Sequence, residues 1–143
     1  MTKLQQLLNK KSRHISSVRP DSTVLDAIQK MADENIGALM VLDGDRPVGI
    51  FTERLYARKV FLLGRGSPTT KVSDVMENHV IYARPTQSVD ECMAIMTEKQ
   101  IRHLPIMDDD ELVGIVSIGD LVKNKIADQE FSIEQLEQYI RTS

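Results

Sequence analysis

The residues with the clearest chemical potential are Ser117 and Asp120, a hydroxyl and a carboxylate three positions apart. Ser117 lies in an apolar, β-branched run at 114–118, which is typical of a buried strand, and Asp120 leads into a helix-like stretch at 121–125. Free N–H groups at a helix start favour anions, so Ser117 can meet a phosphate, and Asp120 can accept two hydrogen bonds from a vicinal diol such as a ribose. The alternative is structural, because Ser and Asp are also ordinary N-capping residues.

The same stretch occurs twice in the chain. Thr52 lies 65 positions before Ser117, and the same shift superposes Val-Gly-Ile at 48–50 on Val-Gly-Ile at 113–115. A period of this length indicates two copies of one compact unit rather than a solenoid.

Composition narrows the class of protein. The 143 residues carry a net charge of −3 and a single cysteine, which argues against a dedicated nucleic-acid binder and suits a reducing compartment. No segment has the apolar core of a signal peptide or approaches the ~20 apolar residues of a membrane span. We expect a cytoplasmic protein with no nucleic-acid or membrane partner.

Each copy reads as strand, helix, strand, strand, helix. The expected strands lie at 15–18, 38–42, 47–52, 80–83, 103–107 and 112–117, and the expected helices at 2–10, 24–34, 53–63, 72–76, 89–99 and 119–127. Capping-box spacing at 132–135 predicts a separate terminal helix, and Gly37 offers a left-handed end to the helix at 24–34. A unit of about 55 residues is marginal alone, so we expect the copies to share a core in an α/β (α+β) fold with pseudo-two-fold symmetry.

The order of elements, Arg-His-Leu-Pro-Ile at 102–106 and Gly-Ile-Val-Ser-x-x-Asp at 114–120 resemble a cystathionine β-synthase (CBS) domain pair, or Bateman module. The stretch at 52–60, Thr-Glu-Arg-x-Tyr-Ala-Arg-Lys-Val, resembles the form found in small stand-alone bacterial pairs. The resemblance places the first repeat at 10–66 and the second at 74–130, with flanking helices at 1–9 and 131–143.

The resemblance implies a regulatory module that binds AMP, ADP, ATP or NAD in a cleft between the repeats and signals to an effector protein by changing conformation. In the family's pattern Asp120 holds the ribose hydroxyls and Ser117 approaches the phosphate. Further nucleotide-binding residues are implied around the base and the phosphate: Ile15, Ser16, Gly37, Ala38, Ile115, Arg102, His103, Thr52, Arg54 and Arg58. Modules of this kind commonly form two-fold dimers, so a homodimer is expected.

The first copy departs from the pattern because Leu55 stands where the second copy has Asp120. A leucine cannot accept the ribose hydroxyls, and each charge-assisted hydrogen bond contributes about 1.5–3 kcal/mol. We therefore expect one competent site, at Asp120, and one degenerate site, where Arg54 and Arg58 can still hold phosphate.

No catalytic or metal-binding constellation is present in the sequence. The histidines at 14, 79 and 103 are far apart and have no partner at metal-ligand spacing, and Cys92 replaces an alanine of the first copy on a helix, as expected for core packing. We expect no enzyme and no required cofactor. The other class of function is a ligand-independent dimerisation or scaffold module that uses the terminal helices around Leu7 and Ile140 and has vestigial clefts.

Overall fold

The computed structural model describes residues 2–10 and 14–142. The chain divides into two compact units, one made of residues 14–81 and the other of the N-terminal residues together with the chain from 82 onward. The predicted bounds of the repeats and flanking helices also take in residues 1, 11–13 and 143, which lie outside the described part of the chain.

The unit at 14–81 is built on a three-stranded sheet with the strand order β1-β2-β3. Strand β2 pairs in parallel with β1 and antiparallel with β3, and helix α2 packs its apolar face on this sheet. The elements are β1 (Ser17–Val18), α2 (Val24–Glu34), β2 (Ala38–Asp43), β3 (Arg46–Thr52), α3 (Glu53–Leu55), the π-helix η1 (Tyr56–Phe61) and the 3-10 helix η2 (Val72–Asp74).

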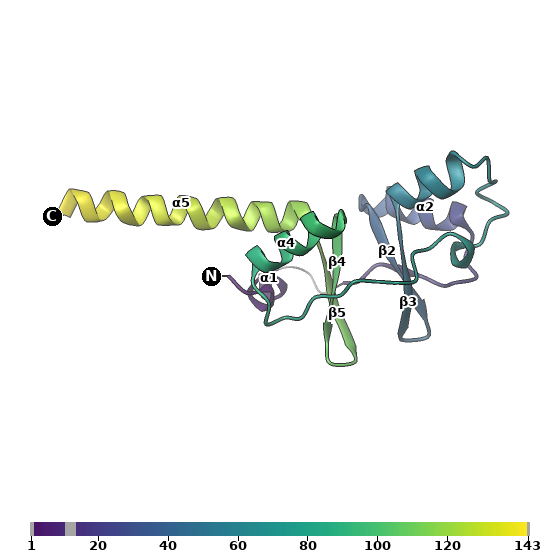
Figure 1. The fold of residues 1–143 in the computed structure, drawn as a ribbon, viewed down its shortest axis with the longest axis horizontal. Coiled ribbons are helices and arrows are strands. Elements are labelled where there is room, and N and C mark those ends of the chain that lie inside the picture. The colour runs from purple at the N-terminus through teal and green to yellow at the C-terminus, as the bar shows by residue number, and fades with distance from the viewer. Residues whose placement is uncertain (1, 11–13, 143) are drawn as a thin grey trace. The chain divides into compact units, whose positions relative to one another are not determined.

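The second unit repeats the plan around an antiparallel hairpin (Figure 1). Its elements are α1 (Leu4–Lys10), α4 (Val89–Lys99), β4 (His103–Asp108), β5 (Glu111–Ser117) and α5 (Ile118–Thr142). The strand predicted at 80–83 is reduced to one bridge: Ala83 N donates to Pro105 O and Met107 N donates to Ala83 O, both at 2.9 Å. A proline follows soon after, at 85, and limits how far a strand can extend there.

Equivalent caps confirm that the two units are copies of one structure. Thr23 and Ser88 each accept a hydrogen bond at 3.1 Å from the backbone N–H three residues on, at the start of α2 and α4. Asn35 and Gln100 end these helices in the left-handed region, with φ of 54° and 56°. The prediction that Gly37 takes this role is wrong, because the helix ends two residues earlier at Asn35, a residue type that tolerates positive φ.

Helix α1 completes the second unit, although it is far from that unit in sequence. Its segment makes three backbone hydrogen bonds there: Leu4 N to Gln87 O, Gln5 N to Pro85 O, and Val89 N to Thr2 O, at 2.9, 3.0 and 2.9 Å. The linker makes the same three bonds in the unit at 14–81: Val72 N to Ser22 O, Ser73 N to Pro20 O, and Val24 N to Thr70 O, at 2.8, 3.0 and 2.8 Å. Residues 2–8 are therefore the structural counterpart of residues 70–76.

The correspondence extends to two glycines that face these segments. A β-carbon at Gly114 would lie 2.5 Å from Leu8 Cδ2, and one at Gly49 would lie 2.6 Å from Met76 Sδ and 3.0 Å from the carbonyl oxygen of Glu77. Each glycine thus gives a strand of the hairpin room to pack directly on the segment that completes its unit.

Two helices differ from the sequence predictions. The separate helix predicted from the spacing at 132–135 is wrong, because α5 runs without a break from Ile118 to Thr142. Residues 120–142 contain no glycine or proline, so each added residue extends an existing helix instead of nucleating a new one. The helix predicted at 53–63 has only a short α-turn, and the π-helix η1 follows, with Leu62 N donating to Ala57 O at 3.0 Å.

Candidate functional site

Ser117 and Asp120 form a reciprocal capping box where β5 meets α5. Asp120 N donates to Ser117 Oγ at 3.1 Å, and Ser117 N donates to Asp120 Oδ2 at 2.8 Å. Ser117 and Asp120 therefore do cap the helix, which was the structural alternative for these residue types. The same bonds fix the hydroxyl and the carboxylate at the N-terminus of a 25-residue helix, where N–H groups and the helix dipole favour anions.

Three other predicted residues lie beside this box in the same unit. His103 is the register partner of Ser117 in the β4–β5 hairpin, and the carbonyl of Arg102 accepts from the N–H of Ile118 at 2.9 Å. Ile115 lies two residues before Ser117 on the same face of β5 and is half-buried. The Arg102 side chain is exposed. The start of β4 and the β5–α5 junction thus gather a cation, an imidazole, a hydroxyl and a carboxylate at one end of the hairpin.

The unit at 14–81 has the same junction but lacks the carboxylate. Thr52 Oγ1 accepts from Leu55 N at 3.1 Å, which matches the first bond of the capping box. The reciprocal bond is absent here because Leu55 has no acceptor, and its side chain instead packs against the apolar core. Ala38 pairs with Thr52 in the hairpin register, and the carbonyl of Gly37 accepts from Glu53 N at 3.1 Å.

Ser16 is buried and has a partner that the sequence did not reveal. Its hydroxyl donates to Glu34 Oε1, and its carbonyl accepts from Met40 N at 3.1 Å. Glu34 also lies 3.4 Å from His14 Nε2. The hydrogen bond from Ser16 lowers the pKa of the Glu34 carboxyl, and the positive charge of Lys30 adds to this effect. No sequence spacing links positions 16 and 34, because the end of α2 meets the start of the sheet only after folding.

The remaining predicted residues fall in the unit at 14–81 as well. Ile15 is half-buried, and Arg54 and Arg58 lie exposed on α3 and η1. The predicted residues thus form two sets, one in each unit, and their joint role in binding a nucleotide stays a prediction.

Cys92 is buried in α4. Burial, with a smaller contribution from the nearby Glu91 carboxylate, raises the pKa of the Cys92 thiol to about 11. A thiol of this kind is almost entirely protonated near neutral pH and is a poor nucleophile. Within residues 2–10 and 14–142, no cluster of His, Cys, Asp and Glu could hold a metal ion, and no helix is long and apolar enough to cross a membrane.

The sequence model of the CBS domain matches the chain twice, at residues 11–58 and 72–126. The "CBS domain-containing protein CBSX3, mitochondrial" of Arabidopsis thaliana is 40% identical over 126 residues, which cover 85% of this chain but only 61% of that protein. The "CBS domain-containing protein YhcV" of Bacillus subtilis is 34% identical over 115 residues, covering 80% of this chain and 81% of that protein.

Solved structures agree with the sequence matches. A CBS-domain protein from Burkholderia ambifaria has a TM-score of 0.87 at 52% identity and covers 90% of this chain and 96% of its own. The CBS domain protein PAE2072 from Pyrobaculum aerophilum, solved in complex with AMP, has a TM-score of 0.73 and covers 82% of this chain and 88% of its own. Its identity of 21% shows a shared fold alone.

Two matched repeats that span most of the chain show that this protein belongs to the CBS-domain family. It is a CBS-domain regulatory module with a mixed α/β fold and helices at both ends, as the motifs at 102–106 and 114–120 predicted.

Proposed function

We propose that this chain is a sensor that binds an adenine nucleotide, AMP, ADP, ATP or NAD, through Ser117 and Asp120 in its second repeat. The observation that carries the proposal is the reciprocal capping box, which fixes the carboxylate and the hydroxyl at the start of α5. The complex of PAE2072 with AMP supports the proposal because it shows that this fold can hold AMP.

The capping box is suited to a nucleotide because it orients Asp120 before any ligand arrives. An ionised carboxylate has about four acceptor sites and can meet the two hydroxyls of a ribose. Arg102 lies beside the helix N-terminus and adds positive charge for the phosphate. A preoriented site loses less entropy on binding than one that must be ordered by its ligand.

The same argument gives one competent site per chain. Leu55 offers the ribose nothing in place of the carboxylate, and each missing charge-assisted hydrogen bond weakens binding by about 1.5–3 kcal/mol. In our proposal Thr52, Arg54 and Arg58 contribute at most to phosphate.

Two groups of residues complete the proposed ligand set and remain predictions. His103 would contact the phosphate, and the base would lie among Ile15, Ser16, Gly37, Ala38 and Ile115. Among these, the Ser16 hydroxyl is engaged with Glu34, so in our proposal Ser16 offers the base its backbone rather than its hydroxyl.

Regulation requires that the nucleotide bind one conformation of the module more tightly than another. We propose that this difference is transmitted to an effector protein and that the module acts as a homodimer in the cytoplasm. The Arabidopsis relative is described as mitochondrial, so the subcellular location of this chain is tested by fractionating cells that express it.

Calorimetric titration of AMP, ADP, ATP and NAD tests the proposal. We expect one site per chain, and Asp120→Ala should weaken binding at least about tenfold. Asp120→Asn keeps an oxygen for the capping bond but removes the charge, so it separates loss of the ligand contact from loss of the cap. Asp110→Ala removes an exposed carboxylate from the β4–β5 turn of the same unit and should leave binding unchanged.

Two results would contradict the proposal. Two equivalent sites per chain would show that Leu55 does not disable the first repeat. Absence of heat with all four nucleotides, in protein shown to be folded by circular dichroism, would favour the ligand-independent scaffold.

A further inference from the structure

The C-terminal half of α5 extends beyond the body of its unit. The first half of the helix packs on α4 and β5, and Lys125 Nζ is 2.9 Å from Asp90 Oδ1. Every side chain from 126 to 141 is exposed, and the yellow end of α5 projects past the rest of its unit in Figure 1. Its apolar side chains stay in contact with water, so a partner that covers them would stabilise the arm.

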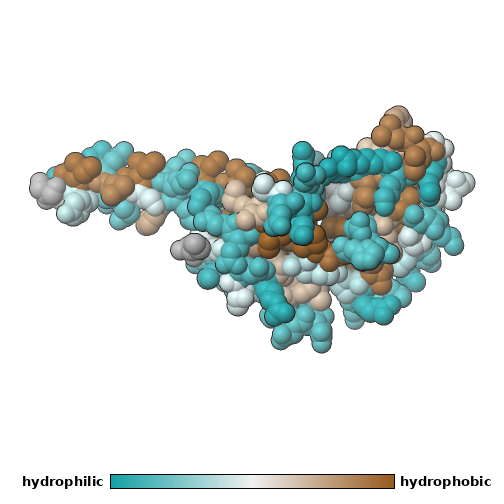
Figure 2. Space-filling model, in the orientation of Figure 1, coloured by the Kyte–Doolittle hydropathy of each residue, from teal (hydrophilic) through white to brown (hydrophobic). Residues whose placement is uncertain are grey.

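An apolar stripe with heptad spacing begins at Val122 and continues along the arm, residues 126–141. Val122, Ile126, Ile133, Leu136 and Ile140 follow one another at intervals of four, seven, three and four residues, and Gln129 occupies the remaining position of the pattern. These apolar side chains are exposed, from 38% for Val122 to 70% for Ile140. In Figure 2 the brown side chains continue along this projecting helix. A hydrophobic repeat with a mean interval of 3.5 residues is the signature of a coiled-coil seam.

We propose that the arm of α5 pairs in parallel with the arm of a second copy of this chain. The isoleucines at 126, 133 and 140 fall at the a positions of the heptad, and Val122 and Leu136 fall at d. In a parallel coiled coil, isoleucine at a with leucine at d favours two helices over three or four.

Gln129 favours the same occupant and the same direction. In a parallel, in-register pair each layer of the seam meets itself, so the Gln129 amide meets the Gln129 amide of the second copy and the two can hydrogen-bond. In the antiparallel alignment that covers all five apolar residues, Gln129 would face Ile133, and its amide would be buried without a partner.

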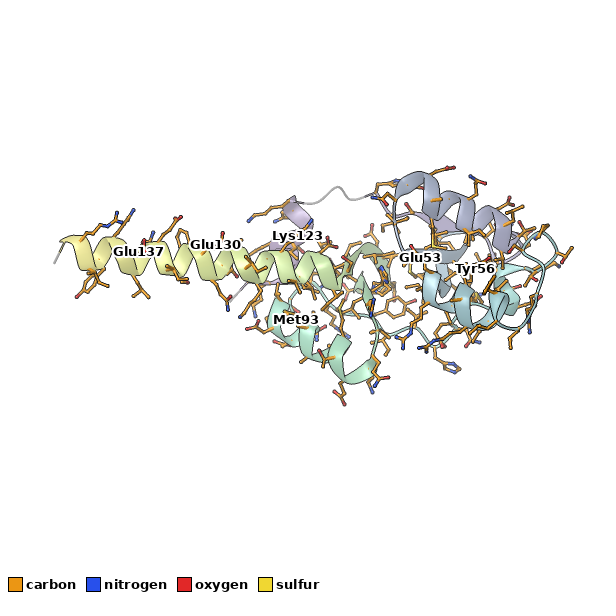
Figure 3. The ribbon with its side chains drawn as sticks, turned by 90° about the horizontal axis from the view of Figure 1, so that it is seen from above. Glu53, Tyr56, Met93, Lys123, Glu130 and Glu137 are labelled. Atoms are coloured by element: carbon orange, nitrogen blue, oxygen red, sulfur yellow. The ribbon has the colours of Figure 1, made fainter. Side chains whose placement is uncertain are left out.

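Charges beside the seam can pair across a parallel dimer. Lys123, Glu130 and Glu137 recur every seven residues along one flank of α5 (Figure 3). By its position in the heptad, Lys125 falls on the other flank. In a parallel pair Lys125 faces Glu130 of the second copy, and it remains 40% exposed while paired with Asp90 in its own unit. The antiparallel alignment would bring Glu130 against Glu130 but Lys123 against Glu137, so the direction is set by Gln129 and not by these charges.

Cysteine cross-linking in the full-length chain tests the pairing, whatever other contacts the protein makes with itself. Leu136→Cys places two thiols in one layer of the parallel seam, within the span of a disulfide. Phe131→Cys is the matched control, because Phe131 is equally exposed, at 63% against 62%, but lies on the opposite side of the helix. We expect mild oxidation to give a covalent dimer with Leu136→Cys only, since the native Cys92 is buried.

Sedimentation equilibrium supplies the second measurement. The double variant Ile133→Glu and Leu136→Glu should weaken self-association at least about tenfold, whereas Phe131→Glu should leave it unchanged. Equal cross-linking at 131 and 136, no cross-linking at 136, or a wild-type chain that stays monomeric would overturn the proposal. None of these readouts involves a nucleotide, so they are independent of the proposed sensor function.

Discussion

Helix α1 should be essential to the second repeat although more than 70 residues separate them in the sequence. Leu4 is completely buried, and its backbone N–H is bonded to Gln87 O at 2.9 Å, which prevents the helix from shifting to fill a void. Leu4→Ala removes buried methyl groups and leaves a cavity, and such changes lower the free energy of unfolding by about 2–5 kcal/mol. Because the backbone is anchored, we expect a loss in the upper half of that range, about 3–5 kcal/mol.

Urea unfolding gives the size of the loss, and amide hydrogen exchange gives its location. Protection should fall at residues 82–142 and stay nearly unchanged at 14–81. Leu62→Ala is the control, because Leu62 is 72% exposed and its truncation should change stability by less than about 0.5 kcal/mol. A loss below about 1 kcal/mol for Leu4→Ala, or an equal loss of protection in both units, would refute the assignment of α1 to the second repeat.

Three other predictions concern single positions. Gly49→Ala and Gly114→Ala should each destabilise the chain in thermal unfolding, by about 1–3 kcal/mol, and Gly49→Ala should cost more because its β-carbon would meet a backbone oxygen at 3.0 Å, whereas that of Gly114 meets the end of a leucine side chain. If Gly114→Ala costs more, the packing argument fails. The Ser16 hydrogen bond lowers the pKa of Glu34 below its ordinary value of 4.5, so this carboxylate stabilises the fold above that value and its contribution disappears as the pH falls through the lowered pKa. Denaturation at a series of pH values should therefore show a smaller loss on acidification for Glu34→Gln than for the wild type, and identical profiles would contradict this. Cys92 should not react with a thiol reagent near pH 8 until denaturant is added, whereas rapid labelling of the native chain would contradict its burial.

Local signals account for the elements that the sequence predicted well. Helices α2 and α4 have the bounds expected from their Thr23 and Ser88 caps, because a capping bond involves residues only three positions apart. The hairpins also follow local rules, with a positive φ at Gly44 in one turn and at Asp109 in the other.

The predictions that failed concern helices whose course was not set by the local sequence signal. The sequence Ser-Ile-Glu-Gln at 132–135 has capping-box spacing, but an uninterrupted helix already runs through it, and continuing α5 is easier than ending it. Likewise, η1 takes a π-helical form that residues 56–61 did not indicate.

The sequence by itself determined the duplication, the family and the chemical difference between Asp120 and Leu55. Repeats, motifs and residue types depend only on which residue stands at each position, so no coordinates are needed to find them. Only the tertiary structure decided that α1 completes the distant second repeat, that Glu34 holds Ser16, and that the arm of α5 is exposed. The physical reason is that these contacts join residues far apart in the chain, or depend on what covers a helix face. No spacing within a single element encodes either of these.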